Sequence, residues 1–209
     1  PRLKAKAGKQ KGILLCTHWD SRPWADQDLD IQKQKLPLVG ANDGLSGTAL
    51  LLALAQDFSK TKLKVPVALV FFDGEDLDNP ALGSQGLAGS RHFAQNYNLK
   101  NYEYGLLLDM VGGKNLTIYR EQFSEKVAKK FNDRVFSLAQ KMGITAFKNS
   151  VKHSIVDDHV PLNQAGLPTI DLIDFDYPHW HTSQDTIDKL SGERLLSVGK
   201  VLQKLISEK

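Results

Sequence analysis

Short apolar runs and longer amphipathic segments alternate along the chain. Apolar runs of four to eight residues rich in Val, Ile, Leu and Phe indicate buried strands, whereas apolar residues at every third or fourth position indicate helices. The first pattern predicts strands over residues 12–16, 65–72, 104–110, 116–119 and 169–173. The second pattern predicts helices over residues 46–58, 90–96, 123–142 and 193–206.

This alternation predicts the fold class. Strands separated by helices form a mostly parallel sheet, and such a sheet is covered by helices on both faces. The continuous apolar run 67–72 is typical of a strand buried on both sides. We therefore expect a three-layer α/β fold with a mixed, mostly parallel central sheet. Because the sequence contains neither a repeat nor a low-complexity linker, we expect one catalytic domain over residues 1–209.

Composition narrows the class of protein. Of the 209 residues, 41% are hydrophobic and 24% are charged, which is typical of globular proteins. A net charge of +3 is too small to indicate a nucleic-acid partner. The single Cys16 excludes an intrachain disulfide and a cysteine-based zinc finger.

Three further expectations concern the state of the chain. No apolar run approaches the roughly 20 residues of a membrane-spanning helix, so we expect no membrane span. The chain starts at Pro1, which predicts a processed or trimmed N-terminal part. Without a long exposed apolar stripe, we expect a monomer.

Polar side chains follow three of the predicted strands. They are His18 and Asp20 after the first, Asp73, Glu75 and Asp76 after the second, and Asp109 at the end of the third. Asp43 lies in a glycine-rich turn that leads into the first helix. Since ligands of open α/β sheets bind beyond the carboxyl ends of the strands, these groups predict a site at that edge.

The residue types at this edge are suited to metal chemistry. Asp43, Asp76 and His181 would supply two carboxylates and an imidazole and leave a fourth position open, as in catalytic zinc sites. Glu75 would then be free to act as a general base and acid. His18 and Asp109 could complete a second metal position, with Asp43 bridging the two ions.

Simpler interpretations exist for each residue alone. Asp43-Gly44 is a common turn sequence, and Glu75-Asp76 could be a solvated acidic loop. His18 and His181 could be hydrogen-bonded loop histidines. Only the joint placement of these residues at strand ends favours a site.

Six segments resemble the zinc-dependent aminopeptidase-like superfamily. They are residues 17–21, 40–47, 71–76 and 107–110, Asp158-His159 followed by Pro161, and residues 181–186. In that superfamily the residues that match His18 and Asp109 bind one metal, those that match Asp76 and His181 bind the other, and the residue at Asp43 bridges them. The residue that matches Glu75 is the base.

Within the superfamily the chain is most similar to the glutaminyl-peptide cyclotransferases, in particular the bacterial ones of the animal type. Three features carry this resemblance: Trp180 directly before His181, the doubled acid Asp157-Asp158 before His159, and the stretch 18–26. One departure from the animal enzymes is Asp76, where they have the longer Glu.

The resemblance implies a particular site. One zinc per chain would be held by Asp43, Asp76 and His181. Glu75, Asp109 and Asp157 would form a hydrogen-bonded acidic group beside the zinc and carry the catalytic proton transfers. We also expect substrate contacts from the aromatic residues Trp180, Trp24 and Tyr177.

The implied reaction converts the N-terminal glutamine of peptides or proteins to pyroglutamate with release of ammonia. The α-amine attacks the γ-carboxamide of the same residue, and this intramolecular step needs no activated water. By analogy with bacterial relatives, we expect an exported protein, periplasmic or extracellular.

Two other functions compete with this one. A two-zinc metallo-aminopeptidase would use His18 and Asp109 for a second ion that activates water. Asp157 argues against it, because a further acid near Asp109 lets protonated carboxyls share hydrogen bonds in place of that ion. A receptor or scaffold that has lost its metal is disfavoured because every ligand position is filled.

Overall fold

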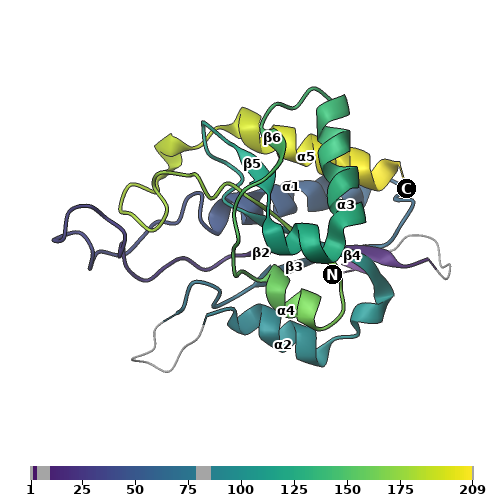
Figure 1. Ribbon diagram of the computed structural model, residues 1–209, viewed down its shortest axis with the longest axis horizontal. Coiled ribbons are helices and arrows are strands. Elements are labelled where there is room, and N and C mark those ends of the chain that lie inside the picture. Colours follow the sequence, from purple (N-terminus) through teal and green to yellow (C-terminus); the bar gives the residue numbers. More distant parts are fainter. Residues whose placement is uncertain (1, 4–9, 79–85, 209) are drawn as a thin grey trace.

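A five-stranded sheet forms the centre of the computed structural model, which describes residues 2–3, 10–78 and 86–208 (Figure 1). The strands follow the order β1-β3-β2-β4-β7. Their bounds are β1 (Arg2–Leu3), β2 (Gly12–His18), β3 (Val67–Phe72), β4 (Tyr102–Asp109) and β7 (Thr169–Ile173). All neighbours pair in parallel except β1, which runs antiparallel to β3.

Helices cover both faces of this sheet (Figure 1). The helices are α1 (Leu45–Lys60), α2 (Ala88–Asn96), α3 (Gln122–Lys141), α4 (His159–Gln164) and α5 (Gly192–Ser207), with the short 3-10 turns η2 (Leu99–Asn101) and η3 (Ile187–Lys189). A small parallel pair, β5 (Ile118–Arg120) and β6 (Phe147–Val151), lies beside the main sheet. The predicted three-layer α/β class with a mixed, mostly parallel sheet is confirmed.

Successive residues of β2 enter two separate hydrophobic cores. Ile13 and Leu15 pack with α1, α3 and α5, whereas Leu14 and Cys16 pack with α2 and α4. This is the alternation of side chains expected along a strand. Each of the four residues is fully buried, which explains why the run is apolar without interruption.

Close packing at two glycines brings the start of α1 to the carboxyl end of the sheet. Gly44 has a φ of +84°, and a Cβ there would lie 2.4 Å from the carbonyl oxygen of Asp20. A Cβ on Gly47 would lie 2.2 Å from Oγ1 of Thr17. Only glycine fits at these positions, and Asp43, two residues before α1, is thereby held at the edge of β2.

The observed elements differ from the predicted ones mainly at their ends. The strand predicted from residue 65 begins at Val67, because Pro66 has no N–H to donate to a neighbouring strand. Strand β6 and helix α4 were not predicted. None of the helices in the described parts of the chain is long and apolar enough to cross a membrane.

Candidate active site

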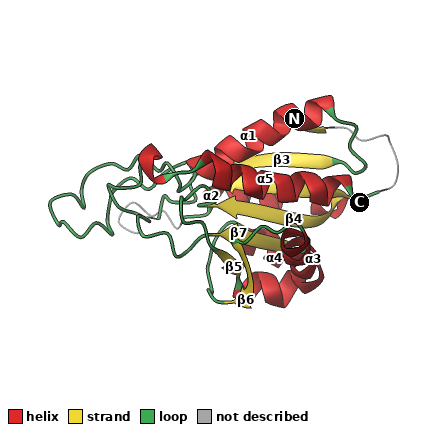
Figure 2. Ribbon diagram, turned by 90° about the horizontal axis from the view of Figure 1, so that it is seen from above, coloured by secondary structure: helices red, strands yellow, loops and turns green. Residues whose placement is uncertain are grey.

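The polar residues predicted at the strand ends meet at one end of the molecule, where the long loops gather (Figure 2). His18 and Asp109 are the last residues of β2 and β4, and Asp43 precedes α1. Asp76 lies in the loop after β3, and His181 lies in the loop after β7. Each side chain thus comes from a different segment of the chain, and each segment adjoins a strand or a helix.

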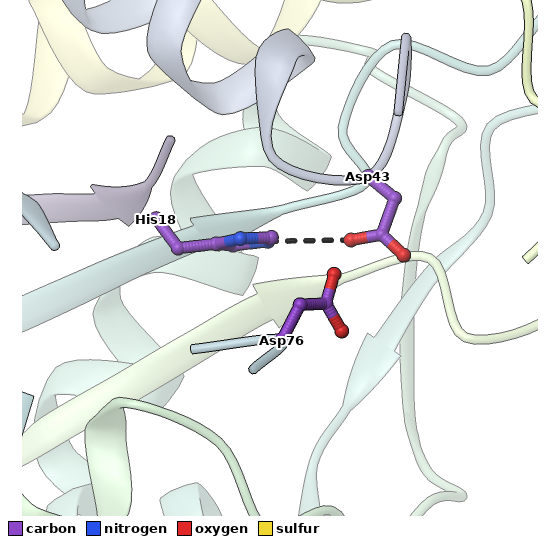
Figure 3. A group of neighbouring side chains, drawn as sticks. All are labelled: His18, Asp43 and Asp76. Carbon is purple, nitrogen blue, oxygen red and sulfur yellow. Dashed lines mark ion pairs between the residues drawn. The ribbon is translucent and has the colours of Figure 1, made fainter. Parts of the chain in front are cut away.

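Asp43 lies between the two histidines. Its Oδ1 is 3.3 Å from Nε2 of His18, and its Oδ2 is 3.4 Å from Nε2 of His181. The Nε2 of His181 also lies 3.0 Å from Oδ1 of Asp76, and the Nε2 of His18 lies 3.1 Å from Oδ1 of Asp109. Figure 3 shows the ring of His18 facing Asp43, with the carboxylate of Asp76 alongside.

These groups suit a divalent metal ion. Ligand atoms of His18, Asp43 and Asp76 lie within 4.8 Å of one another. The Oδ2 atoms of Asp43 and Asp76 are buried and have no hydrogen-bond partner among the described residues. A buried carboxylate oxygen without a partner is costly, and a cation removes that cost. Imidazole and carboxylate are the ligands of catalytic zinc sites, so the donor set fits zinc.

Two further carboxylates fix the backbone at the candidate ligands. Asp20 accepts the N–H of Glu75 at 3.3 Å and the N–H of Asp76 at 3.1 Å. Asp185 accepts hydrogen bonds from the N–H of Asp43 at 3.0 Å and from the Tyr177 hydroxyl at 2.8 Å. Outer contacts of this kind orient metal ligands and tune their affinity.

The backbone of His181 is strained. Its φ of +54° lies in the left-handed region, which is uncommon for residues other than glycine. The Trp180 ring stacks on the imidazole with centroids 4.0 Å apart, and Nδ1 of His181 lies 3.5 Å from Oδ1 of Asp26. Strain of this kind persists where the surroundings over-determine it, and it clusters at functional sites.

Comparisons with known proteins agree with this geometry. The family description "Peptidase family M28" matches residues 1–206. The chain belongs to peptidase family M28. Its relatives of known structure include the glutaminyl cyclase of Bacteroides thetaiotaomicron, crystallised with N-acetylhistamine, with 34% identity and a TM-score of 0.87 over 95% of this chain and 73% of that one.

Other M28 relatives carry two different names. A Zn-dependent exopeptidase from Parabacteroides distasonis has 35% identity and a TM-score of 0.89 over 95% of this chain and 74% of that one. The glutaminyl-peptide cyclotransferase of Bothrops jararaca is 25% identical over 95% of this chain and 62% of its own length. The chain thus spans about three fifths of that curated cyclotransferase.

A buried group of carboxyls lies beside the candidate ligands of this M28 site. Burial, and then the nearby charge of Asp157, hold the pKa of Glu75 well above its ordinary value. Burial likewise raises the pKa of Asp157. Burial raises the pKa of Asp109 to about 7, although the hydrogen bond with His18 opposes this shift. Carboxyls with raised pKa values can hold and pass protons near neutral pH.

A cavity of about 290 Å³ opens onto these carboxyls. Glu75, Asp109 and Asp157 line it on one side, and Trp180 lines it with other apolar side chains, namely Ile155, Ile173 and Phe175. Most of its other lining residues are ionisable, among them Asp43, Asp76 and His181, so the cavity sets an apolar wall opposite many charged groups, as functional sites do.

Trp24 and Tyr177, which we expected to contact substrate, are not among the described residues that line this cavity. Trp24 is 40% exposed, and Tyr177 is buried with its hydroxyl on Asp185. The position of Tyr177 instead suits a residue that positions Asp43 through Asp185.

The sequence analysis missed the positioning residues Asp185 and Asp26. Asp185 belongs to the segment 181–186 that carries the family resemblance, but no pattern in the sequence indicates that its carboxylate accepts the N–H groups of Asn42 and Asp43. Asp26 faces His181 across 155 residues of chain, 181 minus 26, and no spacing rule predicts that contact.

Proposed function

We propose that this protein is a zinc-dependent glutaminyl-peptide cyclotransferase, which converts the N-terminal glutamine of peptides to pyroglutamate and releases ammonia. One observation carries the proposal: an acidic group made of the half-buried Glu75 and the buried Asp109 and Asp157 lines a cavity beside the zinc-type ligands. The bacterial structural relatives that are named glutaminyl cyclase support the same reaction.

We assign one zinc per chain to Asp43, Asp76 and His181. When bound there, zinc supplies Lewis-acid chemistry: it polarises the γ-carbonyl of glutamine and stabilises the negative charge on its oxygen. Asp185 and Asp20 hold the backbone of the two carboxylate ligands, and the Trp180 ring holds the imidazole.

Glu75 is the group that moves the proton. The α-amine nitrogen forms a bond to the γ-carbon, Glu75 takes a proton from that nitrogen, and it delivers a proton to the amide nitrogen, whose bond to the γ-carbon then breaks to release ammonia. The raised pKa of Glu75 suits both directions of this transfer. Asp109 and Asp157 act with Glu75 as a buried group that shares protons.

The apolar side of the cavity assists by excluding water. Trp180, Phe175 and Ile155 offer a surface for the methylene groups of the glutamine side chain. Because the amine and the amide belong to one residue, holding the side chain folded between these walls supplies most of the rate advantage. Displaced water cannot compete as a nucleophile.

A two-zinc aminopeptidase is the second candidate. The observation that favours it is the pair His18 and Asp109, whose Nε2 and Oδ1 atoms lie 3.1 Å apart. This pair lies on the opposite side of Asp43 from His181 and could hold another ion. Against it stands Asp157, whose buried carboxyl shares the cavity with Asp109 and lets protonated carboxyls take the place of that ion.

We further propose that the partners of this protein are peptides or proteins that begin with glutamine. It acts as a monomer and as one domain over residues 1–209. An exported location fits the modification of secreted peptides and follows from analogy alone.

Ammonia release and a metal count on the same sample test the proposal. The zinc-loaded protein is incubated with a peptide that begins with glutamine. We expect ammonia at a rate proportional to enzyme, with about one zinc per chain. Two metals per chain, no ammonia and release of free amino acids from other peptides would contradict the proposal and establish the aminopeptidase.

A further inference from the structure

A second cavity continues the first one along the helices α2 and α4. It measures about 480 Å³ and shares three residues with the active-site cavity: Leu87, Arg91 and Val156. The two helices lie side by side on one face of the sheet (Figure 1). We call this second cavity the α2–α4 groove. Because these three residues line both hollows, the groove and the active-site cavity adjoin each other, with Leu87, Arg91 and Val156 at their boundary.

The groove has a distinct chemical character. Its walls are small or apolar, with Ala94, Val160, Pro161 and Ala165. Two amide side chains, Gln95 and Gln164, stand along it. Among its described lining residues, Arg91 is the one charged side chain, and it lies where the groove meets the active-site cavity. The active-site cavity, in contrast, is lined by several carboxyls.

We infer that the α2–α4 groove binds the peptide chain that follows the N-terminal residue of the substrate. This inference rests on the proposed function. A glutamine held with its amine beside Glu75 must direct its own carbonyl, and the rest of the peptide, out of the active-site cavity. The junction at Arg91 and Val156 is an exit whose continuation is already shaped as a groove.

The charged residues of the two cavities determine in which direction the peptide binds and which side chains it carries. The amino terminus enters the carboxyl-rich cavity, and Arg91 at the junction meets the carbonyl groups or an acidic side chain of the following residues. The same guanidinium repels a lysine or arginine in that place. Gln95 and Gln164 offer donors and acceptors to an extended backbone, which the small walls admit closely.

Val156 adds an independent observation. Its side chain is 67% exposed although it lies at the junction of the two cavities. Burying an exposed apolar side chain under a bound peptide is favourable, because it removes apolar surface from water. The substrate class is therefore peptides of at least three or four residues, with small or acidic residues and not basic ones after the glutamine.

Peptide length tests the inference. The kcat/KM for Gln-Ala-amide is compared with those for Gln-Ala-Ala-amide and Gln-Ala-Ala-Ala-amide, each residue adding up to about 3.5 Å of reach. We expect a rise of at least about tenfold from the dipeptide to the tetrapeptide, since remote binding energy contributes to kcat/KM. A tetrapeptide with Lys in the third position should lose most of this gain, and one with Glu should keep it.

Two variants, each with a matched control, locate the effect. Ala165→Trp places a bulky side chain in the groove and should lower the tetrapeptide-to-dipeptide ratio toward one. Ala53→Trp is the matched control, since Ala53 is exposed on α1, across the sheet from the groove, and this variant should leave the ratio as in the wild type. Arg91→Gln should reduce the discrimination between Glu and Lys, whereas Arg194→Gln on α5 should not.

Binding provides a readout besides turnover. The affinity for pyroglutamyl tetrapeptide amide, measured by calorimetry, should exceed that for the dipeptide amide, and Ala165→Trp should remove the difference. Equal kcat/KM for all lengths, or a ratio that Ala165→Trp leaves unchanged, would overturn the groove assignment while leaving the proposed function intact. If none of the three peptides is cyclised, the proposed function fails, and the groove assignment fails with it.

Discussion

The carboxylate of Asp185 accepts a hydrogen bond from the backbone N–H of Asp43 at 3.0 Å. It also accepts the N–H of Asn42 at 2.9 Å, and it is held in place by the Tyr177 hydroxyl at 2.8 Å. The loop that carries His181 therefore fixes the orientation of Asp43, a second proposed ligand. This contact couples two ligands that are 138 residues apart, 181 minus 43.

Removing the charge of Asp185 should loosen zinc binding. We expect Asp185→Asn to lower zinc affinity by about 10- to 100-fold, because contacts that orient metal ligands contribute that much. Competition with a chelator measures it. Asp188→Asn is the matched control, since Asp188 is exposed and bonds only to Thr186 and Lys189 in the described hydrogen bonds. Equal affinities of Asp185→Asn and wild type would disprove the coupling.

Glu75→Gln should separate metal binding from proton transfer. The variant keeps the size of the side chain but cannot take a proton, so ammonia release should fall by at least about 100-fold. Zinc content should stay at the wild-type level, because Glu75 is not an assigned ligand. Glu193→Gln, an exposed change on α5, serves as the control. Cyclisation at the normal rate in Glu75→Gln would remove Glu75 from its role.

Replacing the two histidines of the site should have unequal effects on zinc. His181→Ala removes a proposed ligand and should cost most of the bound metal. His18→Ala should leave the metal count near that of the wild type, because in the one-zinc account His18 contacts Asp20, Asp43 and Asp109 without being a ligand. His92→Ala, exposed on α2, controls for loss of a histidine. Full zinc occupancy in His181→Ala would refute the ligand assignment.

Because of Glu121, the free energy of unfolding should depend on pH in the acidic range. Burial alone would raise the pKa of Glu121, but hydrogen bonds from His159 and from the N–H groups of Phe123 and Ser124 outweigh it and lower the pKa to about 2. The unfolded value is about 4.3. Stability from this group is thus fully present above about pH 5 and is lost as the pH falls toward 2.

Urea unfolding of Glu121→Gln checks this expectation. At pH 7 the variant should be less stable than wild type by about 1–3 kcal/mol, because hydrogen bonds to a charged group are lost at the start of α3. The difference should shrink steadily between pH 5 and pH 2. Glu208→Gln, at the end of α5, should show no such change. A difference that stays constant with pH would contradict the assigned pKa.

Much of the fold could be predicted because burial dictates residue type. Strand β7 was predicted with its bounds, since all five of its residues are buried and the run is bounded by polar segments. Strand β6 was missed because four of its five residues are exposed and read as a polar loop. Helix α4 was missed because it has only six residues, one of them Pro161, too few for a helical period.

The candidate site, like the fold, could be predicted only in part. The residues at strand ends could be predicted, because parallel strands deliver their carboxyl ends to one edge. The contacts of Asp185, Asp20 and Asp26 could not, because each joins segments that only tertiary packing brings together. The positive φ of His181 also lies outside any sequence pattern, since it arises from the contacts of Trp180 and Asp26 around it.

The most direct test of the central claim is the identity of the product from one peptide. The zinc-loaded protein is incubated with Gln-Ala-Ala-Ala-amide, and the product is analysed by mass spectrometry. The account predicts a peptide of unchanged length that has lost one ammonia, and Glu75→Gln should form far less of it. Free glutamine together with the shortened Ala-Ala-Ala-amide would contradict the account and show an aminopeptidase.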